Sequence, residues 1–179
     1  MQDTADPRGM TRRELLASGV KAGAVLVIGS SFIAHATDSW ALQTKALKPE
    51  TMATLVQMAR DIYPHDRVSD KYYALAVRSH DEKAAEDADY RAMIEQGVDS
   101  LNTLAKARGA KNYLATGWEA ERVAILREIE DSDFFQTIRG GLVVGLYNQK
   151  EIWPVFGYEG ESFSKGGYID RGFDDIDWL

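Results

Sequence analysis

The chain of 179 residues contains no cysteine. This absence excludes disulfides, thiolate zinc sites, iron–sulfur ligation and C-x-x-C-H attachment of c-type haem within this chain. Positive charge is also scarce, because 21 basic residues stand against 28 acidic ones and the formal net charge is −7. The sequence has no basic stripe, which argues against nucleic acid as a partner.

Signatures of phosphate and metal sites are incomplete. The run Gly140-Gly141-Leu142-Val143-Val144-Gly145 lacks the Lys-Ser/Thr of a P-loop and the G-x-G-x-x-G of a dinucleotide fold, and no strand precedes it. Gly141 and Gly145 fall on one helical face, which predicts close approach of another segment. Asp174, Asp175 and Asp177 favour a solvated rim over a cation site. We therefore expect no cofactor and no metal in this chain.

What the sequence does contain is a helical scaffold. Hydrophobic residues make up 45% of the chain, and they recur at helical spacing without internal repeats or β runs of useful length. These patterns predict an all-α, irregular bundle of four to five helices with an extended aromatic and glycine-rich C-terminal tail. The first expected helix opens at Lys48-Pro49-Glu50, the third runs from about Asp87 to Ala107, and the last starts at Asp131 or Ser132 and runs through Tyr147. The tail spans 149–179.

Local signals set the expected helix ends. Tyr63-Pro64 ends the first helix, since the residue before a proline disfavours helical geometry. Ser69 or Asp70 can cap the second helix, and Gly109 suits the end of the third. Thr116-Gly117-Trp118-Glu119 matches a capping box, and Trp118 is expected on the same face as Ile125, Leu126 and Ile129.

The first 36 residues are typical of an export signal. Arg12-Arg13 precedes a weakly apolar run from Val20 to Ala34, and Ala34-His35-Ala36 offers a small-x-small cleavage site. Paired arginines before such a run resemble the twin-arginine signal of bacteria. The run is shorter than the ~20 residues of a spanning helix, although a short retained anchor is an alternative. We therefore expect a signal peptide at 1–36, a single helical domain at 37–179 and a periplasmic location.

Histidine offers few candidates for chemistry. His65 and Asp66 adjoin in an expected loop after Tyr63-Pro64, but catalysis or metal binding needs further groups nearby. A turn role is the favoured interpretation for this pair. His80 shares a helical face with Tyr73 and is interpreted as a packed histidine.

The region 133–179 holds ten of the eighteen aromatic residues. From Trp153 onward seven rings are interspersed with glycines without helical or strand periodicity. Burying ~150–250 Å² per ring gains on the order of 35 kcal/mol, and ordering 27 residues costs about 40. Such a tail cannot hold a shape alone, so it must lie on the helical core, on another protein, or on both.

Together these features resemble the gluconate 2-dehydrogenase subunit 3 family. The resemblance is carried by Arg12-Arg13, the helix through Phe134-Phe135 to Gly145-Leu146-Tyr147, and the tail, and it is strongest over 133–179. It implies a non-catalytic small subunit of a membrane-associated complex. The expected partners are a large FAD-containing subunit of the glucose-methanol-choline type, which this chain would stabilise and escort through export, and a multihaem cytochrome c.

The tail residues expected to bind the partner are rings, glycines and a proline. They are Trp153, Pro154, Gly157, Tyr158, Gly166, Gly167, Tyr168, Phe173 and Trp178. One alternative is a stand-alone periplasmic binding protein whose groove is lined by Tyr and Trp. A more distant one is an independent enzyme that uses His65 and Asp66.

Overall fold

A computed structural model describes residues 27–28, 31–32 and 44–169 of the chain. Five α-helices are present in this part: α2 (Pro49–Ile62), α3 (Asp70–Glu86), α4 (Ala88–Ala107), α5 (Glu119–Glu128) and α6 (Asp133–Tyr147). Three 3₁₀ helices follow or connect them: η1 (Tyr113–Ala115), η2 (Lys150–Phe156) and η3 (Phe163–Lys165). The all-α bundle predicted from the sequence is confirmed.

A single antiparallel pair is the only strand structure in the described residues. Strand β1 (Val27–Ile28) pairs with β2 (Ser31–Phe32), with Val27 opposite Phe32. Both strands are two residues long and fall within the predicted signal peptide. The twin arginines, Phe173, Trp178 and the acidic residues at 174, 175 and 177 lie outside the described residues, so those predictions stay predictions.

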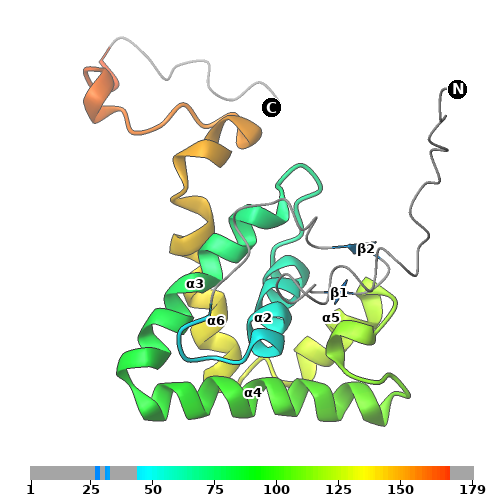
Figure 1. The fold of residues 1–179 in the computed structure, drawn as a ribbon. Helices are drawn as coiled ribbons and strands as arrows, with labels where there is room; N and C mark the ends of the chain where they lie inside the picture. The colour runs from blue at the N-terminus through cyan, green and yellow to red at the C-terminus, as the bar shows by residue number, and fades with distance from the viewer. Residues whose placement is uncertain (1–26, 29–30, 33–43, 170–179) are drawn as a thin grey trace, which may run out of the picture.

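Helix α2 is the centre of the bundle. It packs against α3, α4, α5 and α6, while α3 and α6 lie side by side and α4 runs across one end (Figure 1). The apolar positions that recur at 3–4 spacing in the sequence form one contiguous core. Its fully buried large side chains are Met52, Leu55, Met58, Tyr73, Ile94, Leu101, Tyr113, Ile125, Ile138, Leu142, Leu146 and Ile152.

Side-chain caps begin three of the helices. Ser69 accepts a hydrogen bond from the Lys71 amide, and Asp87 accepts one from the Tyr90 amide at 2.9 Å. Ser132 Oγ accepts from the Phe135 amide at 3.2 Å. These caps satisfy amides that have no partner inside the helix. The predicted stop after α4 is confirmed by Gly109, whose φ of 87° is readily adopted by glycine.

The predicted capping box before α5 is wrong. The N-cap residue is Trp118, which makes no side-chain cap, and its indole is 77% exposed rather than packed with Ile125 and Leu126. Thr116 is buried at the end of η1, where its hydroxyl donates to the Asn112 carbonyl at 3.3 Å. The Thr116 carbonyl accepts from Arg122, which also pairs with Asp61 of α2, so tertiary contacts outweigh the local capping signal here.

Glycines bring α3 and α6 into close contact, as predicted. A Cβ added at Gly141 would stand 2.9 Å from the His80 ring, and one at Gly145 would stand 2.8 Å from the Ala76 carbonyl oxygen. Gly141 and Gly145 therefore lie on the face of α6 that packs against α3. His80 is buried and its Nδ1 lies 2.5 Å from the Tyr90 hydroxyl, which confirms it as a packed histidine.

Two buried carboxylates join the helices to neighbouring segments. Asp61 of α2 pairs with Arg122 of α5 through two contacts of 2.8 and 2.9 Å and accepts from the Tyr113 hydroxyl at 2.8 Å. Asp81 of α3 accepts three consecutive backbone N–H groups from residues 45–47. These bonds fix residues 45–47 at the start of α2 and the contact between α2 and α5.

Of the helices described here, none has both the length and the apolar character needed to cross a membrane.

Candidate docking site in the C-terminal segment

The chain leaves α6 and enters a segment without α-helix at residues 150–169, which we call the C-terminal segment. In Figure 1 it extends beyond the end of α6 and away from the rest of the bundle. Its first part is attached to the bundle and its second part is not. The attachment is made by side chains of η2, among them Val155, which packs against the core.

Ile152, Trp153 and Phe156 attach η2 to the bundle. Ile152 is completely buried in the common core. Trp153 packs against that core and its indole N–H donates to the Tyr147 carbonyl at 2.8 Å. The Phe156 ring meets the edge of the His65 ring, with centroids 4.9 Å apart. Each contact returns the chain to the end of α6 or to the loop after α2.

His65 belongs to this attachment. Its Nε2 lies 2.7 Å from the Tyr147 hydroxyl, and the two rings meet edge to face at 5.6 Å. Burial lowers the pKa of His65. The Val68 amide donates to the His65 carbonyl at 3.1 Å, so the predicted turn role is confirmed, while Asp66 is exposed in the turn. His65 thus links the α2–α3 loop to α6 and to the C-terminal segment.

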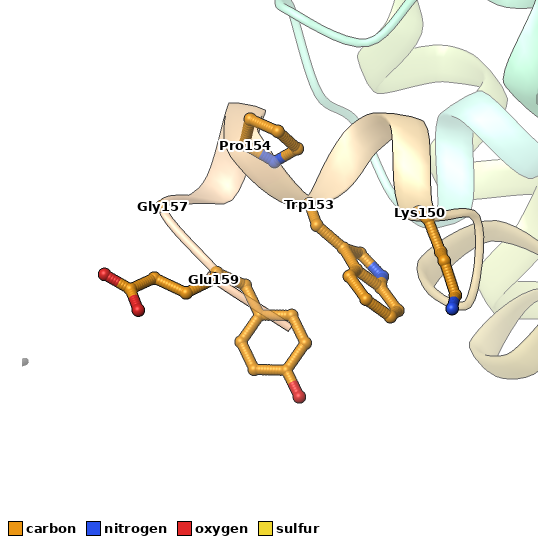
Figure 2. A pocket seen from close by; sticks show the side chains of 6 residues that line it. Lys150, Trp153, Pro154, Gly157 and Glu159 are labelled. Atoms are coloured by element: carbon orange, nitrogen blue, oxygen red, sulfur yellow. The ribbon is translucent and has the colours of Figure 1, made fainter. Parts of the chain in front are cut away.

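An open pocket lies where η2 ends. Its lining residues are Lys150, Trp153, Pro154, Gly157, Tyr158 and Glu159. The Trp153 and Tyr158 rings meet at 71° with centroids 5.1 Å apart, and the Lys150 ammonium lies 5.6 Å from the Trp153 ring. Figure 2 shows Lys150 and Trp153 extending to the same side, with the Glu159 carboxylate pointing away from them. The pocket therefore has an aromatic wall with a cation at its edge.

Glycines turn the chain back at this pocket. Gly157 ends η2 with a φ of 71°, a left-handed conformation that glycine adopts without strain. A Cβ at Gly160 would stand 3.2 Å from the Trp153 ring, so this residue also permits close approach. Tyr158 is thereby folded back over Trp153, and the attachment ends with it.

Beyond Gly160 the side chains face solvent. Phe163 is 93% exposed, Ile169 is 83% exposed and Tyr168 is 61% exposed. Gly166 and Gly167 both have positive φ and form the turn after η3, where the Gly167 amide donates to the Ser162 carbonyl at 2.8 Å. The outer part is thus locally hydrogen-bonded, but its apolar side chains have no core to enter.

The structure divides the described members of the predicted partner-binding set into two groups. Trp153, Pro154, Gly157 and Tyr158 line the pocket, whereas Gly166, Gly167 and Tyr168 form the outer turn. The sequence-based set omitted Phe156, Phe163 and Ile169. Phe156 and Phe163 are rings of the same aromatic series, so that series already contained the signal for them. Nothing in the local pattern distinguished Ile169.

No group of three or more histidine, aspartate or glutamate side chains in this part of the chain is placed to hold a metal ion. The fold and the C-terminal segment define a helical bundle with a solvent-facing aromatic extension. Comparisons of the chain with protein-family models, with curated proteins and with solved structures found no match.

Proposed function

We propose that this chain is the non-catalytic small subunit of a periplasmic, membrane-associated flavoprotein dehydrogenase complex. It binds and stabilises the large FAD-containing subunit and escorts it through twin-arginine export. The observation that carries the proposal is the exposure of Phe163, Tyr168 and Ile169 in a segment that packs on the bundle through η2. The resemblance to the gluconate 2-dehydrogenase subunit 3 family identifies the kind of partner.

Exposed apolar side chains favour an interaction surface. Monomeric soluble proteins rarely expose large contiguous apolar patches, and aromatic anchors dominate the binding energy of interfaces. Single exposed apolar residues are ordinary, but here three occur within seven residues. Their local turns keep the side chains in solvent, which suits a surface that becomes buried on association.

The remaining members of the complex follow from the resemblance. The large subunit, of the glucose-methanol-choline type, carries FAD and oxidises a sugar, sugar acid or alcohol. A multihaem cytochrome c subunit passes electrons towards the membrane. In this arrangement the bundle holds no cofactor, and its N-terminal Arg12-Arg13 supplies the export signal for both the bundle and its partner.

Export of the partner tests the proposal. Replacing Arg12-Arg13 by Lys-Lys is expected to leave the FAD-containing partner in the cytoplasm, measured as flavoprotein content and dehydrogenase activity of periplasmic and membrane fractions. The matched control is Arg8→Lys, which lies outside the arginine pair. Undiminished export of the flavoprotein from the Lys-Lys strain would contradict the escort role.

A second candidate is a stand-alone periplasmic binding protein, favoured by the pocket beside Trp153 and Tyr158. Aromatic walls with a few polar groups are typical of small-molecule sites. This candidate predicts a stable monomer whose tryptophan fluorescence changes saturably with a ligand, and loss of that change in Tyr158→Ala. Purification of the chain in a stoichiometric complex with a flavoprotein would favour the first function.

A further inference from the structure

The C-terminal segment separates into an attached part and a presenting part. Residues 150–160 are held by Ile152, by the Trp153 hydrogen bond to the Tyr147 carbonyl and by the Phe156 contact with His65. Residues 161–169 place Phe163 and Ile169 almost wholly in solvent. The first set of apolar side chains already has partners within the bundle. The second set is free to enter a pocket on another molecule.

The sequence from residue 159 to the end of the chain is acidic. From residue 159 to the end, the sequence has six acidic and two basic residues, a formal net charge of −4. One of the two basic residues, Lys165, lies 3.3 Å from the Glu159 carboxylate and is therefore already compensated. Glu161 is exposed beside η3. An apolar contact within an acidic stretch of the chain is complementary to an apolar surface rimmed by lysine and arginine.

The same charge argues against two other occupants. Membrane surfaces are anionic and attract basic segments, so an acidic segment is repelled from them. A symmetric dimer formed through this segment would bring the acidic segment against its own equivalent, which like-charge repulsion opposes. A protein surface with basic residues around an apolar pocket meets neither objection.

We propose that Phe163, Tyr168 and Ile169 are the contact residues of this chain and that they enter an apolar pocket, rimmed by basic residues, on the large subunit. Trp153, Phe156 and Tyr158 act as positioning residues that hold the contact residues away from the bundle. This inference rests on the proposed function, since it takes the partner to be the flavoprotein. It adds which side chains are buried on association and what surface receives them.

The test uses the full-length tagged chain expressed in its native cells. Three forms are compared: the wild type, the double variant Phe163→Ser/Ile169→Ser, and Trp118→Ser. Trp118 is a matched control because its large ring is also exposed but lies at the start of α5. The amount of FAD-containing protein recovered with each form is measured, together with the melting temperature of each purified variant.

The expected result is at least about a tenfold loss of flavoprotein from the double variant and no loss from Trp118→Ser, with melting temperatures unchanged, since losing two anchors weakens association by this order or more. Equal recovery with all three forms would overturn the inference and leave the proposed function standing. Recovery of no flavoprotein with the wild type would overturn both.

Ionic strength tests the basic rim separately. Dissociation of the purified complex is measured at about 0.05 M and about 0.5 M NaCl, where screening weakens exposed charge pairs. A rise in Kd of about tenfold or more supports complementary charge, and a Kd independent of salt overturns that part of the inference. Binding of the chain to anionic phosphatidylglycerol vesicles that is lost in Phe163→Ser/Ile169→Ser would identify lipid as the occupant and overturn it as well.

Discussion

Gly145 of α6 lies directly against the backbone of Ala76 in α3, so close that a Cβ on Gly145 would stand 2.8 Å from the Ala76 carbonyl oxygen. The atom in the way belongs to the backbone of a helix and cannot rotate aside. Gly145→Ala is therefore expected to reduce the free energy of unfolding by about 1–3 kcal/mol, the range for overpacking a well-packed contact. Denaturant titration followed by circular dichroism measures this change.

Gly140 supplies the matched control for that substitution. It lies in the same helix, but a Cβ there would meet nothing within 4 Å. Because alanine restricts the unfolded chain more than glycine does, Gly140→Ala is expected to stabilise the protein by ~0.5–1 kcal/mol. If both substitutions changed stability in the same direction, the close α3–α6 contact would be contradicted.

Breaking the Asp61–Arg122 pair is expected to reduce the free energy of unfolding more than breaking an exposed ion pair does. The Asp61 side chain is only 2% exposed, so Arg122→Ala would leave a buried carboxylate without its cation. Breaking such a pair costs about 3–5 kcal/mol. The exposed pair between Arg108 and Glu128 is the control, because surface ion pairs contribute about 0–1 kcal/mol. Equal losses in Arg122→Ala and Glu128→Ala would refute the distinction.

The lowered pKa of His80 predicts how the free energy of unfolding depends on pH. Burial first, and then the nearby charge of Lys83, lower the pKa of His80 from 6.5 to about 4. The unfolded chain therefore binds a proton between these values that the folded chain does not. On this basis the free energy of unfolding falls as pH drops from about 6.5 to about 4, by up to ~1.4 kcal/mol per pH unit.

His80→Gln removes the titrating ring and is expected to flatten that slope. A smaller slope remains, because the pKa of His65 is also lowered by burial. The comparison uses thermal or urea unfolding of both proteins at several pH values. An unchanged slope in the variant would show that His80 does not titrate on unfolding as predicted.

Trp153 is expected to hold the C-terminal segment without supporting the whole bundle. Trp153→Ala removes the hydrogen bond to the Tyr147 carbonyl and the ring contact with Tyr158. Trypsin should then cleave after Lys150 or Lys165 several-fold faster, while the helical circular dichroism signal is retained. Trp118→Ala, which alters an exposed ring elsewhere, should leave the cleavage rate unchanged, and equal acceleration in both variants would contradict the attachment.

The helices could be predicted from the sequence because their signals are local. Apolar spacing, Pro64 after α2 and Gly109 after α4 act within a few residues of the elements they delimit. The exposed Trp118 and buried Thr116 could not be predicted in this way. Thr116 is held by Arg122, whose guanidinium bonds both the Thr116 carbonyl and Asp61 from another helix.

The candidate site shows the same limit. The abundance of rings and glycines predicted that the tail needs a surface, and part of it does pack on the bundle. Which rings pack inward was not predictable, since the Phe156 contact with His65 joins residues far apart in the sequence. Ile152 is completely buried although it lies between exposed and half-buried neighbours. Non-local packing, rather than composition, divides the segment.

Site-specific photo-crosslinking tests the docking surface most directly. A benzophenone amino acid is placed at Phe163 in the full-length chain, and at Trp118 as control, and the native membranes are irradiated. The predicted result is a covalent product between position 163 and the FAD-containing large subunit, with none from position 118. Docking through Phe163, Tyr168 and Ile169 would be contradicted if position 163 crosslinked only to lipid, only to a second copy of this chain, or to nothing.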